Sequence, residues 1–329
     1  MKGRFTPGVF ELRQRLASSP PFEPGRSVDA RQTLALVEEL ELTKISTPTA
    51  KANEKQSRST QRSKQITERE ADDIEEMSSP RTPVIYEVVR RLGDEEMDRP
   101  IVSLWWSGVA AGLSISFSLL AEAVLRSHLP EASWTPLVAS LGYSVGFVMA
   151  VLSRQQLFTE ITITAVLPVV ANPTLANLWR LLRLWSVVLV ANMAGTFFAA
   201  VMCAFTPILT PELKAAMLDI AGQITNHPWM EMMFRSIASG FLIAALVWLL
   251  PSAEAAQFHV IVVITWLIAA AGFMHIVAGS VEAFFLVLNG HLGLPSMILD
   301  FFIPVLIGNV IGGTALFALI AYAQVMKEI

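Results

Sequence analysis

Two polar interruptions inside long apolar runs constrain the fold of this chain most. From residue 101 onward the sequence is a succession of apolar segments, and two of them are broken by SRQQLFTE at Ser153–Glu160 and by HIVAGS at His275–Ser280. Non-helical backbone at membrane depth is tolerated only where it is buried in protein or lines a cavity. The two stretches therefore predict segments that face the interior of a membrane protein.

The composition supports a membrane protein. The 329 residues are 53% hydrophobic and 16% charged, with a mean hydropathy of +0.52, which is too apolar for a soluble chain of this size. The first 100 residues hold 17 of the 24 Lys and Arg and 18 of the 28 Asp and Glu. A net charge of −4 without a basic block gives no indication of nucleic-acid binding. The single cysteine, Cys203, excludes an intrachain disulfide, and no metal or cofactor motif is present.

The apolar segments predict six membrane spans. Four are long enough, or nearly so, to cross a hydrocarbon core that needs roughly 20 helical residues. The other four form two pairs, and within each pair one polar stretch separates the two segments, so that each pair makes one interrupted span. The segments are Ile101–Leu125, Trp134–Leu152, Ile161–Ala171, Leu178–Phe205, Phe234–Leu250, Phe258–Met274, Ser280–Asn289 and Met297–Tyr322. The broken spans are the second of the first three and the second of the last three. Because each half has an odd number of spans, the two halves have opposite orientations in the bilayer. This pattern predicts an inverted repeat with a site near the midplane. Glycine motifs at Gly108–Gly112, Asn192–Gly195 and Gly308–Gly313 predict close helix packing.

The N-terminal part predicts a different kind of structure. Residues 1–81 are polar and charged and predict a disordered cytoplasmic tail, with no apolar region typical of a cleavable signal peptide. Residues 82–99 predict an amphipathic juxtamembrane helix, and residues 100–329 a six-span channel domain. The apolar face expected on the juxtamembrane helix consists of Val84, Ile85, Val88, Val89 and Leu92.

Basic residues near the span ends predict that both termini are cytoplasmic. With that orientation six basic residues lie inside, against three outside. The inside set is Arg90, Arg91, Arg99, Arg180, Arg183 and Lys327, and the outside set is Arg126, Lys214 and Arg235.

Several strings between residues 100 and 325 resemble the formate/nitrite transporter family. They are WSGVAAGLSISFSLL, QQLFTE, LWSVVLVANMAGT, FRSIASGFLIAALVWL, GFMHIVAGSVE and IPVLIGNVIGGTALF, in this order. The resemblance implies an all-α, aquaporin-like protomer with its own pore, assembled as a homopentamer in a bacterial inner membrane. It further implies that Leu157, Phe158 and Thr159 form the loop in the second span and that His275 is the pore histidine.

Two departures from the family pattern mark a divergent subgroup. Glu160 and Ile161 follow Leu-Phe-Thr where the family usually has Gly-Asn. Gly279 stands four residues after the histidine where the family usually has Asn, and Glu282 follows three residues later.

These residues predict a channel for small monovalent weak-acid anions. Half-helix N-termini at the breaks attract an anion, and His275 can donate a proton that neutralises it for passage through an apolar constriction made by Leu157 and Phe158. Thr159 is then a hydrogen-bond partner of the histidine or of the solute. A structural histidine that only packs between helices is the alternative for His275.

The two new acidic residues require separate explanations. A charge at the midplane costs about 2.5–3.5 kcal/mol, so Glu160 and Glu282 each need a partner, water or a proton. Arg154 is the basic residue in the breaks and the expected partner of one of them. In the alternative interpretation all three lie behind the loops and fix their shape.

Other function classes fit the sequence less well. A channel for a neutral solute, or a proton-coupled transporter that uses Glu160 and Glu282, remains the alternative. The aquaporin class has paired Asn-Pro-Ala motifs, whereas this chain has one near match, at Ala171–Pro173. An intramembrane enzyme is not predicted, since no catalytic dyad or zinc motif falls on an expected span. A further alternative is a sensor or scaffold in which the N-terminal tail is the functional part. Deletion of the tail would abolish the activity of a scaffold, whereas a channel would keep its conductance.

Overall fold

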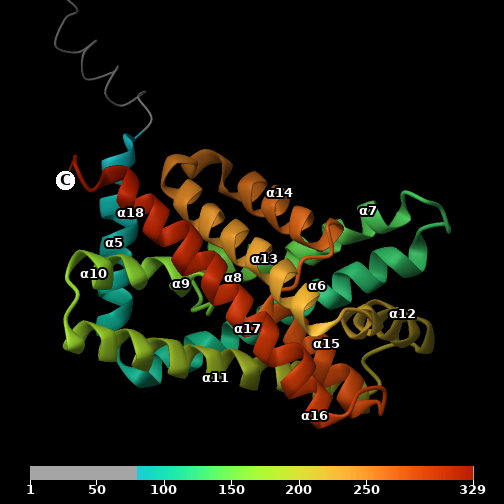
Figure 1. Ribbon diagram of the computed structural model, residues 1–329. Helices are drawn as coiled ribbons and strands as arrows, with labels where there is room; N and C mark the ends of the chain where they lie inside the picture. The colour runs from blue at the N-terminus through green and yellow to red at the C-terminus, as the bar shows by residue number, and fades with distance from the viewer. Residues whose placement is uncertain (1–79, 329) are drawn as a thin grey trace, which may run out of the picture. The chain divides into compact units, whose positions relative to one another are not determined.

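The structure is a computed structural model that describes residues 80–328. The predicted tail falls outside the described residues, apart from Pro80 and Arg81. Within the described range all regular structure is helical (Figure 1). Regular structure begins with α5, Thr82–Asp98, which precedes the first long apolar helix, α6, Ile101–His128.

The remaining helices follow in two sets. The first set is α7 (Thr135–Ala139), η1 (Ser140–Tyr143), α8 (Ser144–Leu152), α9 (Ile161–Thr164), α10 (Val166–Ala171), α11 (Leu175–Phe205), α12 (Pro211–Gly222) and η2 (Gln223–Asn226). The second is α13 (Trp229–Leu249), η3 (Leu250–Ser252), η4 (Glu254–Ala256), α14 (Gln257–Ala270), α15 (Ile276–Leu288), α16 (Leu294–Ser296), η5 (Met297–Phe302), α17 (Ile303–Val310), η6 (Ile311–Ala318) and α18 (Leu319–Val325).

Between residues 80 and 328, five helical stretches are long and apolar enough to cross a membrane. They are Ile101–His128, Thr135–Leu152, Leu175–Phe205, Trp229–Ser252 and Leu294–Val325. Shorter apolar helices cover Ile161–Ala171, Glu254–Ala270 and Ile276–Leu288. The helices are interrupted between Leu152 and Ile161 and between Ala270 and Ile276, where the sequence has its polar stretches.

Local sequence explains where several helices begin. Pro100 directly precedes α6, and the Thr174 hydroxyl accepts a hydrogen bond from the Asn177 N–H at the start of α11. Thr210 caps α12 in the same way and is followed by Pro211, a residue suited to the first helical position.

Glycines bring the long helices close together. A Cβ added to Gly112 of α6 would lie 2.3 Å from the Asn192 carbonyl oxygen, and one added to Gly195 of α11 would lie 2.3 Å from that of Val109. In the other half, a Cβ on Gly308 of α17 would lie 2.3 Å from the Met233 carbonyl oxygen of α13. The predicted role of the glycine motifs in close packing is confirmed.

The buried face of α5 differs from the expected one. Val89 is buried and Ile85 packs against the core, but Val84, Val88 and Leu92 are exposed. The buried positions are Tyr86, Val89, Gly93 and Met97, and they face α9, α10 and the helices around them. The helical periodicity predicted for residues 82–99 was correct. The face that α5 buries in the protein is a different one from the five residues grouped by the sequence, because Tyr86 and Gly93 were not counted as apolar positions.

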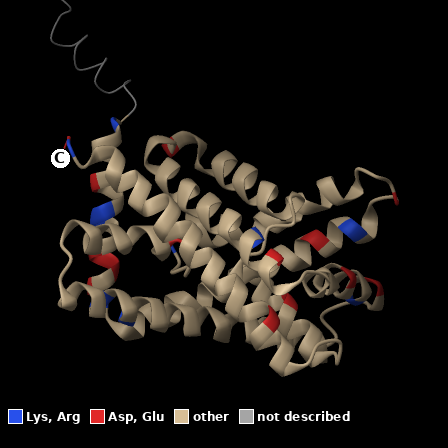
Figure 2. Cartoon of the chain, viewed as in Figure 1, with Lys and Arg blue, Asp and Glu red and all other residues tan. Residues whose placement is uncertain are grey.

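Charged residues of the described segment gather mainly toward the helix ends, and a few acidic ones lie on the apolar helices (Figure 2). Those few acidic residues on the apolar helices need a structural or functional reason for their position.

Candidate functional site

The two interruptions bring Thr159 and His275 into direct contact. The Thr159 Oγ1 lies 2.7 Å from the His275 Nε2, and the two residues are 0% and 2% exposed. They come from opposite halves of the chain, 116 positions apart. The histidine was one of the two hydrogen-bond partners expected for Thr159, and the structure shows this contact.

The second ring nitrogen of His275 fixes its tautomer. His275 is the N-cap of α15, and its Nδ1 accepts a hydrogen bond from the Ala278 N–H at 3.2 Å. A neutral imidazole that accepts at Nδ1 carries its proton on Nε2. The Nε2–H therefore donates to the Thr159 hydroxyl oxygen, and the Thr159 hydroxyl proton is available to a third group.

The cap also opposes a positive charge on the ring. Protonation of Nδ1 would break the bond to Ala278 and place a cation at the positive end of the 13-residue helix α15. Phe147 of α8 presents an edge-to-face contact to the imidazole, with ring centroids 5.0 Å apart. This environment holds His275 as a neutral hydrogen-bond donor.

Buried asparagines hold both breaks in place. In the first half, the Asn192 Oδ1 accepts from the Phe158 N–H at 2.9 Å, and its Nδ2 donates to the carbonyl oxygens of Gln156 and Gly108. The side chain is 0% exposed. All of its bonds go to main-chain groups, so Asn192 fixes the path of the backbone.

Asn309 repeats this arrangement in the second half. Its Oδ1 accepts from the Ile276 N–H at 2.8 Å, and its Nδ2 donates to the carbonyl oxygens of Met274 and Ser236. Sequence reasoning quoted both asparagines inside small-residue motifs but missed this role. The available signal was an amide side chain in the middle of each apolar run, where an unpaired polar group is unfavourable.

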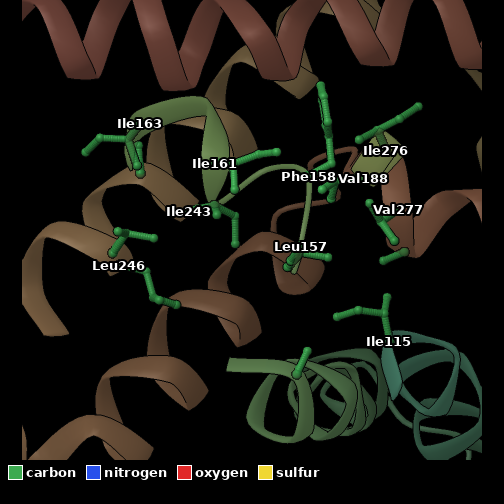
Figure 3. Packing of buried hydrophobic residues seen from close by; sticks show 14 of the residues in the cluster. Ile115, Leu157, Phe158, Ile161, Ile163, Val188, Ile243, Leu246, Ile276 and Val277 are labelled. Carbon is green, nitrogen blue, oxygen red and sulfur yellow. The ribbon is translucent and has the colours of Figure 1, made fainter. Parts of the chain in front are cut away.

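Leu157 and Phe158 belong to the apolar core around the first break. Both are at most 2% exposed and lie in one cluster with Ile115, Val188 and Ile276 (Figure 3). The Phe158 ring has an edge contact with Trp185, with centroids 5.9 Å apart. The polar pair Thr159 and His275 is thus set directly beside a buried apolar region.

Glu160 is partly buried beside the pair and close to α5. Its Oε1 has no hydrogen-bond partner within the described residues, and its charge and that of Glu96 repel each other. Glu96 was not predicted as a site residue, because the sequence placed it on a juxtamembrane helix outside the spans.

Glu282 lies on α15 and has a corresponding acidic neighbour. Its charge and that of Glu122 on α6 repel each other, and Tyr143 lies near both carboxyl groups. Tyr143 stacks against Phe147, which in turn contacts His275. One pair of acidic residues therefore stands toward each side of the central contact.

Arg154 does not form the pairing that the sequence suggested. It is exposed and adopts a left-handed backbone conformation with φ of 51°. Among residues 80–328, neither Glu160 nor Glu282 has an ion pair with Arg154 or another basic side chain. The tight turn after α8 directs this arginine away from both glutamates.

Gly279 makes room for an aromatic ring. A Cβ at Gly279 would lie 2.6 Å from the Cζ of Phe301, a residue of η5 that is 3% exposed. Phe301 also lines a cavity of about 230 Å³ together with His227 and Asp300. The phenyl ring thus separates α15, one turn beyond His275, from this cavity.

Comparison with known proteins identifies the family. The sequence profile described as Formate/nitrite transporter matches residues 83–323. The chain belongs to the formate/nitrite transporter family. The resemblance stated from the sequence motifs is confirmed.

Relatives within the formate/nitrite transporter family differ in their similarity to this chain. The Inner membrane protein YfdC of Escherichia coli (strain K12) is 43% identical over 248 residues, which cover 75% of this chain and 80% of that protein. The Formate channel FocA of Haemophilus influenzae is 26% identical over 241 residues, covering 65% and 84%.

Solved structures of the formate/nitrite transporter type share the fold. One described as "Pentameric formate channel with formate bound" matches with a TM-score of 0.60 and 21% identity, covering 69% of this chain and 98% of that one. One described as "FNT family ion channel" matches with a TM-score of 0.63 and 18% identity, covering 74% and 98%. These matches place the five membrane-span candidates in the fold of a family of channels and transporters.

Within the described residues of this family member, no group of three or more His, Cys, Asp and Glu side chains could hold a metal ion.

Proposed function

We propose that this chain conducts small monovalent weak acids, of the formate and nitrite kind, across a bacterial inner membrane. The observation that carries the proposal is the 2.7 Å contact between Thr159 and His275. It is a hydrogen-bonding pair in an apolar interior, built from the two breaks that interrupt the membrane helices.

Attraction of the anion comes from the breaks themselves. The N-terminal end of α15 directs the positive end of its helix dipole toward the region of the central pair. A monovalent anion is drawn there without a fixed positive side chain, and so it is not held too tightly to leave.

Passage through the apolar constriction requires a neutral solute. Leu157 and Phe158 offer no hydrogen bonds, and an ionised carboxylate in such a region loses several kcal/mol of hydration. The Thr159 hydroxyl, oriented by His275, donates to the solute oxygen at this point. The anion is neutralised near His275, and the imidazole itself stays neutral because its Nδ1 is used as a helix cap.

The same proposal covers the assembly and the topology. We take the chain as six spans in an inverted 3+3 repeat with an aquaporin-like protomer, the interrupted helices forming the second and fifth spans. Asn192 and Asn309 support the repeat by making equivalent bonds to the two breaks. The named relatives support a homopentamer in the inner membrane, and the distribution of basic residues supports cytoplasmic termini.

A second candidate function is a neutral-solute or proton-coupled pathway that uses Glu160 and Glu282. It is favoured by the absence of an ion pair between these two residues and any basic side chain in the described segment. Anion passage and buried acidic residues are compatible only if the carboxyl groups hold protons or stay out of the path.

Flux into proteoliposomes tests the proposal. Formate, nitrite, hydrosulfide, acetate and urea are compared at mildly acidic and mildly alkaline pH, for wild type and Thr159→Val, which removes the hydroxyl and keeps the shape. The exposed Thr225→Val is the matched control. We expect weak-acid flux that rises at acidic pH and falls about tenfold or more in Thr159→Val, which corresponds to about 1.4 kcal/mol. Flux of urea alone, unchanged by the variant, would contradict the proposal.

A further inference from the structure

Glu160 lies in a hydrogen-bonded frame around Glu96 of α5. The Gln156 Nε2 donates to the Glu96 Oε1 at 3.3 Å, and the Thr164 hydroxyl donates to the Glu96 Oε2. Gln156 and Thr164 are four residues before and four residues after Glu160. Glu160 lies between them in the chain, and its carboxyl group is near enough to that of Glu96 for their charges to repel each other.

The contact between α5 and this region is tight. A Cβ at Gly93 of α5 would lie 1.9 Å from the Thr164 carbonyl oxygen. Glu96 is therefore held at the break by the packing of its own helix, three residues after Gly93, and is not a surface side chain that happens to reach it.

The frame contains acceptors without donors. Both oxygens of Glu96 accept hydrogen bonds, but the Glu160 Oε1 and the Gln156 Oε1 have no partner within the described residues. Gln156 is only 5% exposed, so its amide oxygen is not turned to bulk water. A group of buried acceptor oxygens without a hydrogen-bond donor is a potential site for a proton or a small cation.

Space decides between these two ligands. Each of the two unpartnered oxygens has less than 1 Å² of accessible surface, so no water-sized body touches either atom. A sodium ion or a hydronium ion needs such contact, whereas a proton does not.

The surrounding charged and polar side chains do not supply the missing hydrogen-bond donor. Arg99 attracts the Glu96 charge and Glu95 repels it, both from the end of α5. From α11, the Arg183 Nη2 donates to the Met97 carbonyl oxygen instead. Tyr86 of α5 has an unpartnered hydroxyl and stacks on Tyr322 of α18, with centroids 6.0 Å apart.

We propose that Glu96 and Glu160 form a proton-binding site in which one proton is held by Glu160 and the negative charge by Glu96. Glu96 is the ionised partner, because both of its oxygens already accept hydrogen bonds. The O–H of Glu160 supplies the donor that the frame lacks.

This site deepens the proposed function and rests on it for its role in transport. The protonated carboxyl of Glu160 transfers its proton to the entering anion, leaving a Glu160 carboxylate and a neutral acid that passes Thr159. The O–H bond of Glu160 breaks and the O–H bond of the acid forms, and a hydronium ion from the side from which the anion came reprotonates Glu160 and becomes water. One proton then crosses with each anion.

Infrared spectroscopy of the full chain in lipid tests the proton directly. We expect a carbonyl band of a protonated carboxylic acid at neutral pH whose intensity falls in Glu160→Gln and stays in Glu95→Gln, the exposed neighbour of Glu96. Since Gln is the isostere of a protonated Glu, Glu160→Gln must also fold. An unchanged band, a band replaced by a sodium-dependent one, or a Glu160→Gln variant that fails to fold would overturn the proposal.

Transport separates this inference from the proposed function. A dye inside proteoliposomes should report about one proton entering per formate in wild type, and Glu160→Gln should lower formate flux about tenfold at mildly alkaline pH. A band that belongs to Glu160 in a chain that carries no weak acid keeps the proton site and refutes the proposed function. Weak-acid flux that carries a proton, with no band from Glu160, keeps the proposed function and refutes the proton site.

Discussion

His275 and Leu157 occupy equivalent positions in the two halves of the chain. Asn309 bonds the carbonyl oxygen before His275 and the N–H after it, and Asn192 does the same around Leu157. In addition, His275 and Leu157 each offer a carbonyl oxygen to an N–H four residues on, at 2.8 Å and 3.3 Å. The backbone repeats at the centre, while the side chains there are different.

The two asparagines should therefore be the main supports of the breaks. Replacing either Asn192 or Asn309 by Ala leaves one buried N–H and at least two buried carbonyl oxygens without partners. We expect a loss of roughly 2–5 kcal/mol in each variant, and loss of transport with it. Thermal unfolding in lipid nanodiscs measures the loss. Asn177→Ala, on an exposed turn of the same helix α11, is the control and should change stability little.

His275 should have two separable roles, and Asn can replace one of them. Asn is among the best N-cap residues, so His275→Asn keeps an acceptor for the Ala278 N–H but removes the nitrogen that meets Thr159. We expect His275→Asn to unfold near the wild-type temperature, and His275→Ala to be less stable by about 0.5–2 kcal/mol. Both should lose weak-acid flux. Full flux in His275→Asn would show that the contact with Thr159 is dispensable.

Gly279 and Phe301 should be energetically coupled. A methyl group at 279 would meet the Phe301 ring at 2.6 Å, and overpacking of this kind typically destabilises by about 1–3 kcal/mol. In the presence of Phe301→Leu, Gly279→Ala should be tolerated better, because the shorter side chain can give way. A double-mutant cycle on unfolding free energy measures the coupling, and additive effects would exclude it.

Stability should fall as pH rises because Glu96 and Glu160 hold one proton between them in the folded chain. Burial raises the pKa of Glu96 above its usual range, and its neighbour Glu160 carries the proton. Folding therefore takes up a proton: its contribution is fully present below the unfolded pKa and is lost as pH rises through the folded pKa. We expect the melting temperature of wild type to decrease with pH more steeply than that of Glu96→Gln. Glu95→Gln should keep the wild-type slope, and equal slopes in all three would contradict the assignment.

Periodicity and polar interruptions predicted much of the membrane part of this chain. The apolar runs marked the long helices, and HIVAGS and SRQQLFTE marked the places where the structure leaves the helix. The two breaks could be predicted because polar or irregular segments at membrane depth need a reason, whereas the roles expected of Leu157, Phe158, Thr159 and His275 came from the family resemblance.

Contacts between distant segments could not be predicted in the same way. Glu96 reaches the first break because Gly93 lets α5 approach, and nothing in the local pattern around residue 96 indicates this. Arg154 was placed wrongly, since its direction depends on a left-handed turn that an arginine rarely adopts. Phe301 was overlooked because an aromatic residue on an apolar helix gives no signal until its neighbour is known.

The asparagine clamps have a consequence for how such a protein can change its solute. Because Asn192 and Asn309 hold main-chain atoms, the path of the backbone at both breaks depends little on the side chains of Leu157 and Glu160. Side chains at these two positions can then be exchanged while the backbone keeps its path. In the proposed channel, the residues that fix the backbone and the residues that meet the solute are therefore different, and a change of solute requires a change only in the second group.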